Sequence, residues 1–229
     1  MRTIFILLLV GLLLPLSSFG QKKTKLETQI DSISYALGTD IANNLKRTDL
    51  TINAQTFYQG LADALAGENV KLTDQETRSL LGEFQRMAQA AAQRKSEERA
   101  AVAKEEGELF LQKNKEKKGI QVTESGLQYE VLREGDGPQP TADNTVTVHY
   151  EGRLLNEKIF DSSYQRGETI EFPLRNVIPG WTEGVQLMKT GSKFRFYIPS
   201  DLAYGPRGAG NDIGPNETLI FDIELVSFK

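Results

Sequence analysis

The chain has 229 residues, of which 39% are hydrophobic and 25% charged, and its formal net charge is −4. These fractions are ordinary for a globular protein, and the mild negative charge argues against nucleic acid as the main partner. The absence of cysteine excludes disulfides, thiolate zinc sites and cysteine nucleophiles, and His149 is the one candidate for a histidine-dependent triad or metal site.

The first twenty residues differ from the rest of the chain. Arg2 is followed by the apolar run I-F-I-L-L-L-V-G-L-L-L, and small residues, Ser18 and Gly20 among them, come after it. This pattern is typical of a secretory signal peptide, here residues 1–20. The alternative is a membrane anchor, but the run is shorter than the about 20 apolar residues that a span requires. We therefore expect an exported protein with no stable membrane span after signal cleavage.

Two helices are predicted in residues 21–72. The first has apolar residues at spacings of three and four: Leu26, Ile30, Ile33, Leu37, Ile41 and Leu45. The second has a shorter stripe, with Asn53 as a predicted N-cap and Gly67 at its end: Phe57, Leu61 and Leu65. Because so small a unit buries a marginal core alone, we expect these helices to pair with a second copy of the chain.

A long helix is predicted over residues 73–118. Thr73 and Glu76 have the spacing of a capping box, and no proline or turn cluster interrupts the chain until about Gly119. A helix of about 40 residues would be about 60 Å long. Over residues 88–106 a single valine is the only larger aliphatic residue, so this stretch is predicted to be a solvated stalk with nothing to bury. The alternative is a helix covered by a neighbouring element.

Residues 119–229 change to a period of two. Gly and Pro separate four runs with alternating apolar residues, at 127–131, 146–150, 194–198 and 219–225. This pattern predicts an antiparallel sheet with one buried face. One short helix is predicted to begin at the P-G-W of residues 179–181, with three apolar residues on one face: Trp181, Val185 and Met188. The expected fold class is α+β, with a C-terminal antiparallel sheet wrapped on one short helix and an all-α region before it.

Trp181 is the only tryptophan, and it directly follows a Pro-Gly turn. If the short helix crosses a curved sheet, a tryptophan in its first turn can present its ring to the opening of the apolar layer. Val177 and Ile178 would then line one side of that opening. The alternative is a tryptophan that fills the core.

Four motifs follow one another in this half of the chain: V-H-Y-E-G from Val148, F-D-S-S from Phe160, V-I-P-G-W-T-E-G from Val177 and A-Y-G from Ala203. Their order and spacing closely resemble the FKBP-type peptidyl-prolyl isomerases over residues 120–229. The helical half resembles the N-terminal dimerisation region of the secreted bacterial members, the macrophage-infectivity-potentiator type, which are V-shaped dimers with long helical stalks. The resemblance implies a periplasmic homodimer, with or without association with the outer membrane, whose partners are unfolded or proline-containing polypeptides.

The reaction that this resemblance implies is cis/trans isomerisation of X-Pro bonds. Its barrier, about 18–20 kcal/mol, comes from amide resonance, and no bond has to be made or broken. A surface that binds the twisted amide better than the planar one accelerates the reaction. Because a twisted amide is less polar, a dry apolar pocket favours it, and the resemblance implies no cofactor or metal.

In the resemblance, Trp181 forms the floor of the pocket under the proline ring. Tyr204 would donate a hydrogen bond to a substrate carbonyl, and Asp161 at the rim would engage the distorted amide or orient Tyr150. Tyr150 also belongs to the walls, together with residues from several motifs: Phe160, Val177, Ile178, Ile213 and Phe221. Two alternatives remain, because Asp161 before two serines is also typical of a turn and Tyr204 of a buried aromatic.

Two positions depart from the family pattern. Ile170 stands where a pocket aromatic is usual, with Phe172 beyond it, so the alignment there is open by two residues. Gly214 stands where a proline is common, which is expected to loosen the loop over the pocket.

Three functions are compatible with these features. The first is an isomerase with chaperone activity, because two pockets in a dimer can hold one unfolded chain at two points. The second is a non-catalytic module that grips proline-containing segments, and the presence of both Asp161 and Tyr204 argues against it. The third is a structural dimer with the C-terminal domain as a spacer, which would need no aromatic-lined pocket.

Overall fold

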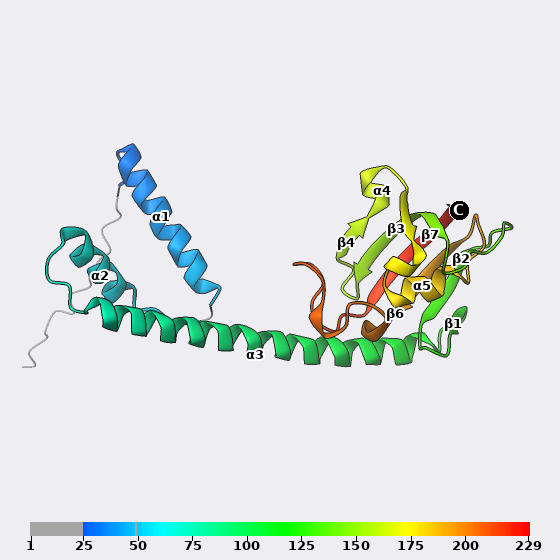
Figure 1. The fold of residues 1–229 in the computed structure, drawn as a ribbon, viewed down its shortest axis with the longest axis horizontal. Coiled ribbons are helices and arrows are strands. Elements are labelled where there is room, and N and C mark those ends of the chain that lie inside the picture. Colours follow the sequence, from blue (N-terminus) through cyan, green and yellow to red (C-terminus); the bar gives the residue numbers. More distant parts are fainter. Residues whose placement is uncertain (1–24, 49) are drawn as a thin grey trace, which may run out of the picture. The chain divides into compact units, whose positions relative to one another are not determined.

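The structure is a computed structural model that describes residues 25–48 and 50–229 (Figure 1). The predicted signal peptide lies outside the described residues. Of the helices in this described part, none is both long enough and apolar enough to cross a bilayer. The chain divides into two units, the first ending at Arg47 and the second running from Thr48 to Lys229.

The first unit is the helix α1 (Gln29–Lys46). It begins with a capping box, in which the Thr28 hydroxyl accepts from the Asp31 N–H and the Asp31 carboxylate accepts from the Thr28 N–H. No residue of α1 is buried, and the predicted apolar stripe is present and exposed: Leu26, Ile30, Ile33, Leu37 and Ile41. Among the described residues of this unit, none covers this apolar face.

The helix α2 (Ala54–Ala66) has the boundaries that its sequence predicts. The Asn53 side chain accepts from the N–H groups of Gln55 and Thr56, and the helix ends at Gly67 in the left-handed conformation, with φ +70°. Its large apolar side chains are exposed too: Phe57, Tyr58, Leu61 and Leu65.

The helix α3 (Asp74–Asn114) has 41 residues, which makes it about 60 Å long. The predicted capping box between Thr73 and Glu76 is confirmed by both of its hydrogen bonds. The prediction that residues 88–106 bury nothing is wrong at the end of that stretch, where the last four turns of the helix begin. One side of these turns is buried or half-buried at helical spacing: Ala100, Ala103, Gly107, Leu111 and Asn114.

This end of α3 is held on the C-terminal domain by Gln128. The Gln128 side chain donates to the Leu111 carbonyl at 2.9 Å and accepts from the Asn114 amide at 3.0 Å. Over residues 100–107 the contact escaped the sequence pattern because α3 offers small residues there, which bury backbone instead of large apolar side chains. A Cβ added at Gly107, for example, would lie 2.3 Å from Thr218 Oγ1.

The rest of the chain forms one seven-stranded sheet in which every pair is antiparallel, as predicted. The strand order is β1-β2-β6-β7-β3-β4, and β5 pairs with β3. The strands are β1 (Ile120–Val122), β2 (Gln128–Arg133), β3 (Thr145–Leu154), β4 (Ile159–Ser162), β5 (Ile170–Pro173), β6 (Lys193–Ile198) and β7 (Leu219–Phe228).

The short helix α5 (Pro179–Val185) packs on this sheet (Figure 1). Trp181, Val185 and Met188 are all buried in the core, as their spacing predicts. Gly184 allows the close approach, because a Cβ there would lie 2.6 Å from the Phe196 ring. Four shorter turns complete the domain: α4 (Ser163–Arg166), η1 (Leu174–Asn176), η2 (Ser200–Leu202) and η3 (Gly205–Arg207).

Candidate functional site

A cavity of about 280 Å³ opens at the start of α5. Its lining comes from β3, β4, β5, β7, η1, α5 and the segments before α5 and η3, so it is assembled from residues far apart in the chain. Most of the lining is aromatic or aliphatic: Tyr150, Phe160, Asp161, Phe172, Asn176, Val177, Ile178, Trp181, Tyr204 and Phe221. A largely apolar cavity with a few polar groups is the usual form of a binding site for a small group.

Trp181 is among the most enclosed residues of this cavity, with 4% of its surface exposed. Three rings stand nearly perpendicular to its indole: Tyr150 at 5.1 Å, Phe172 at 5.6 Å and Phe221 at 5.2 Å between centroids. Each such edge-to-face pair contributes about 0.5–1.5 kcal/mol beyond the burial of its area. The indole is therefore fixed in orientation, although its buried Nε1 has no hydrogen-bond partner among the described residues.

A polar group of three side chains lies at the rim. The Tyr150 hydroxyl donates to one oxygen of Asp161, and Arg166 Nη1 donates to the other. Arg166 Nη2 also donates to the Tyr150 hydroxyl oxygen at 3.1 Å. Arg166 reaches this position because α4 is a single turn, capped by the Ser162 hydroxyl and ended by Gly167 at φ +78°.

These contacts set the charges at the rim. Burial raises the pKa of Asp161, but hydrogen bonds from Tyr150 and Arg166 outweigh it and hold this pKa below its ordinary value of 3.8. Burial, and then the hydrogen bond to Asp161, raises the pKa of Tyr150 to about 12. At neutral pH Asp161 is therefore a carboxylate paired with Arg166, and Tyr150 is a neutral donor.

Tyr204 stands apart from this group. Burial, followed by the charge of Asp161, raises its pKa, so its hydroxyl keeps its proton. That hydroxyl makes no hydrogen bond to any other residue of the described part. Since 39% of Tyr204 is exposed and it lines the cavity, its O–H is available to a bound ligand.

The cavity brings together all but two of the residues predicted from the sequence. Ile170 does not line it, and Phe172, the next residue on the same face of β5, takes the predicted place. Phe172 reaches the Trp181 ring, at 5.6 Å between centroids, because β5 leads at once into η1 and α5. Ile213 is buried in the core, with its backbone bonded to Ala209, and does not line the cavity either.

Three residues of the site were not predicted. Asn176 lines the cavity at the end of η1, and Arg166 bonds the rim from α4. Gly152 lies behind the walls, where a Cβ would come within 2.6 Å of Phe221 and 2.7 Å of Phe160. The last residue of V-H-Y-E-G was the available signal for Gly152, because a glycine in a strand often marks a close approach.

Two other side chains that could act as an acid or a base, His149 and Asp222, lie outside the cavity. His149 Nδ1 lies 3.1 Å from Ser163 Oγ, and its ring stacks on Tyr164 at 4.8 Å between centroids. The Asp222 carboxylate accepts hydrogen bonds from Nε and Nη2 of Arg195, at 2.6 and 2.8 Å.

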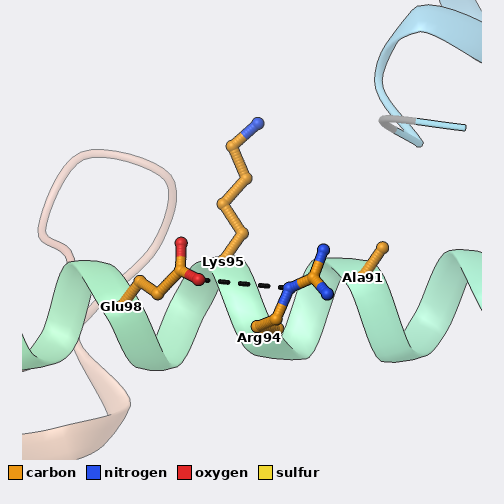
Figure 2. A pocket seen from close by; sticks show the side chains of 4 residues that line it. All are labelled: Ala91, Arg94, Lys95 and Glu98. Atoms are coloured by element: carbon orange, nitrogen blue, oxygen red, sulfur yellow. Dashed lines mark ion pairs between the residues drawn. The ribbon is translucent and has the colours of Figure 1, made fainter.

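Among the described residues, four of α3 line a second hollow of about 360 Å³: Ala91, Arg94, Lys95 and Glu98 (Figure 2). Arg94 and Glu98, one turn apart, form an ion pair at 4.0 Å with both side chains largely exposed. Such exposed pairs contribute little, about 0.3–0.5 kcal/mol on a helix. Although this hollow is larger, it has one methyl group and three charged side chains, so the aromatic cavity is the better candidate site.

Comparison with known proteins shows which family the chain belongs to. Residues 137–226 match the family described as FKBP-type peptidyl-prolyl cis-trans isomerase, and residues 30–131 match the domain amino terminal to it. The chain is 42% identical to the peptidyl-prolyl cis-trans isomerase Mip of Coxiella burnetii, over 100% of this chain and 98% of that protein. It is 46% identical to the probable FKBP-type isomerase FkpA of Neisseria meningitidis, over 84% and 72%.

Solved structures give the same result. The crystal structure of FkpA from Escherichia coli has a TM-score of 0.76 and 36% identity, and the match covers 90% of this chain and 99% of that one. At this identity and coverage the likeness extends to the sequence as well as the fold. The chain belongs to the family of FKBP-type peptidyl-prolyl cis-trans isomerases.

Proposed function

We propose that the cavity around Trp181 is the site at which this isomerase twists X-Pro bonds in exported polypeptides. The observation that carries the proposal is the combination of an immobilised indole floor with one unpaired hydroxyl donor, Tyr204. The floor and walls give the proline ring a dry apolar surface. The donor fits a carbonyl oxygen of the bound segment.

The geometry favours a mechanism without proton transfer or covalent chemistry. Rotation about the X-Pro bond requires loss of amide resonance, and the twisted amide is less polar than the planar one. An apolar cavity therefore binds the transition state better than the ground state, which is the condition for catalysis. The pairing of Asp161 with Arg166 suits a carboxylate that fixes Tyr150 and the rim, since a general acid would need a raised pKa.

Exchange between the cis and trans forms of a short X-Pro peptide, followed by NMR with the mature protein, tests the proposal. We expect line broadening or exchange peaks that grow with protein concentration. A peptide that binds without faster exchange would instead support the second candidate, a module that only grips proline-containing segments. The pair of Asp161 and Tyr204 in one cavity favours the enzyme.

We further propose that the chain acts as a periplasmic homodimer with chaperone activity. The exposed apolar faces of α1 and α2 support pairing through these helices, because uncovered apolar faces of this kind mark interaction sites. A homologue named as an outer membrane protein, the MIP of Legionella longbeachae, supports an exported location. Two cavities on one dimer would hold an unfolded chain at two points and raise its effective concentration.

The corresponding division of the chain is also a proposal. It comprises a signal peptide at 1–20, a dimerisation region at 21–72, a stalk at 73–118 and an isomerase domain at 119–229. Because Ala100, Gly107 and Asn114 pack on the C-terminal domain, the last turns of α3 belong structurally to the isomerase domain. Any truncation meant to isolate that domain should therefore keep residues 100–118.

A charged residue on the apolar face of α1 tests the dimer. We expect Leu37→Glu to halve the mass in sedimentation and to slow refolding of a proline-limited protein, while isomerisation of a short peptide stays unchanged. Leu37 is 61% exposed in the chain alone, so the change should leave the fold intact. Thr39→Glu, two positions along the same helix and off the stripe, is the matched control. An unchanged mass for Leu37→Glu would contradict pairing through this face.

A further inference from the structure

The loop between Tyr204 and β7 is a closed unit. At its base the Asn216 N–H donates to the Gly205 carbonyl at 2.9 Å, and at its tip Ala209 and Ile213 exchange backbone bonds at 2.9 and 3.2 Å. The residues that flank it, Tyr204 and then Phe221 on β7, line the cavity. These bonds close the loop on itself, and the base of the loop directly adjoins Tyr204.

The same loop is docked on α3 (Figure 1). Asn216 Nδ2 donates to the Ala100 carbonyl at 3.2 Å, 116 residues away in the chain. Two turns further along α3, Gly107 lies against the buried Thr218, with room for no side chain. Asn216 has φ +58°, a conformation that asparagine adopts more readily than most residues. In this backbone conformation its side chain points to the helix.

We propose that Asn216 is a positioning residue of the isomerase site, which ties the loop that carries Tyr204 to α3. Its backbone N–H donates to the carbonyl of Gly205, the neighbour of Tyr204, and its side chain donates to a backbone carbonyl of α3. The Tyr204 hydroxyl has no bond of its own within the described part of the chain, so its place is set by this loop. The inference rests on the proposed role of Tyr204, because a donor displaced by about 1 Å loses much of its effect.

Two pairs of variants in the full-length mature protein test this coupling. Asn216→Asp keeps the shape and backbone preference but removes the donor, and Asn211→Asp, exposed in the same loop, is its control. Gly107→Ala drives a Cβ into Thr218, whereas Gly82→Ala in the same helix meets nothing closer than 3.9 Å. Both alanines raise helix propensity equally, so only the contact differs. Thr218→Ala should rescue Gly107→Ala, since the nearest remaining atom lies at 3.3 Å.

We expect Asn216→Asp and Gly107→Ala to lower kcat for a short X-Pro peptide by about threefold to tenfold, with KM little changed, and both controls to match the wild type. In a Tyr204→Phe background these losses should vanish, because there is no hydroxyl left to misplace. Losses that persist in full in that background, or Gly107→Ala equal to Gly82→Ala, would overturn the inference.

A second readout does not depend on activity. The ring signal of Tyr204 in ¹³C-tyrosine spectra is assigned by its loss in Tyr204→Phe. We expect it to shift in Asn216→Asp and Gly107→Ala and to return in Gly107→Ala with Thr218→Ala. A wild type that fails to speed exchange while these shifts occur would refute the proposed function and leave the positioning supported. An unmoved Tyr204 signal in an active enzyme would refute the positioning alone.

Discussion

Replacement of Trp181 by alanine is expected to abolish measurable acceleration of X-Pro exchange. It removes the floor of the cavity and the ring against which Tyr150, Phe172 and Phe221 pack. A loss of activity of about a hundredfold corresponds to about 2.7 kcal/mol of transition-state binding. The same change should lower the free energy of unfolding by about 3–5 kcal/mol, as for other large-to-small changes in cores. NMR exchange and urea unfolding measure the two effects separately.

Because Trp181→Ala is expected to destabilise the fold, its activity has to be compared with that of a variant that is destabilised to a similar extent. Leu127→Ala removes a fully buried side chain that does not line the cavity, and we expect about 2–5 kcal/mol of destabilisation with normal activity per folded molecule. Trp181→Phe keeps an aromatic floor and should retain part of the rate while folding well. Equal activity of folded Trp181→Ala and wild type would show that the tryptophan only fills the core.

Loss of the Asp161 carboxylate is expected to have the next largest effect, about tenfold or more in kcat/KM for Asp161→Ala. The change leaves the Tyr150 hydroxyl and Arg166 without their acceptor and frees the rim to move. Asp161→Asn keeps the shape and one acceptor oxygen, and we expect it to retain more activity than the alanine variant. A folded Asp161→Ala protein with full rate would refute the role of this carboxylate at the rim.

The same carboxylate predicts how the protein responds to acid. Burial opposes ionisation of Asp161, but Tyr150 and Arg166 lower its folded-state pKa below 3.8 on balance. A lowered folded pKa means that the charged pair stabilises the fold above the unfolded pKa, and that this contribution is lost as pH falls through the folded pKa. The acid limb of the stability curve should therefore be shallower in Asp161→Asn than in wild type. Wild-type activity should stay level from about pH 5 to about pH 9, since no rim group titrates there.

Much of the molecule follows from local sequence signals. The limits of α2 are set by Asn53 and Gly67, and the start of α3 is set by the capping box of Thr73, because these motifs satisfy the free backbone groups of a helix end within a few residues. The alternation of apolar residues determined which face of each strand is buried. The spacing of Trp181 and Val185 determined the inner face of α5.

Other features required contacts between segments that are distant in the chain. The choice of Phe172 over Ile170 depends on how β5 turns into α5, since both residues lie on the same face of the strand. Arg166 reaches Asp161 only because α4 stops after one turn. Neither the place of Phe172 nor the contact between Arg166 and Asp161 can be predicted from the spacing of apolar residues in the sequence.

The packing of α3 on the C-terminal domain shows most clearly what the tertiary structure decided. Ala100 lies in the stretch that was predicted to bury nothing, because small residues carry almost no hydrophobic signal, and Gly107 directly follows that stretch. Because both residues are small, the helix backbone can approach the loop closely. Gly107 lies against Thr218, and the Ala100 carbonyl accepts a hydrogen bond from the Asn216 side chain. The sequence by itself determined the helices α1, α2, α3 and α5 and the four longest strands, β2, β3, β6 and β7, through patterns of period and capping that act within one element. Most of the residues that line the cavity followed from the motifs that resemble the family. The docking of the helix on the pocket loop was decided by the fit between two surfaces, which exists only once both elements have folded.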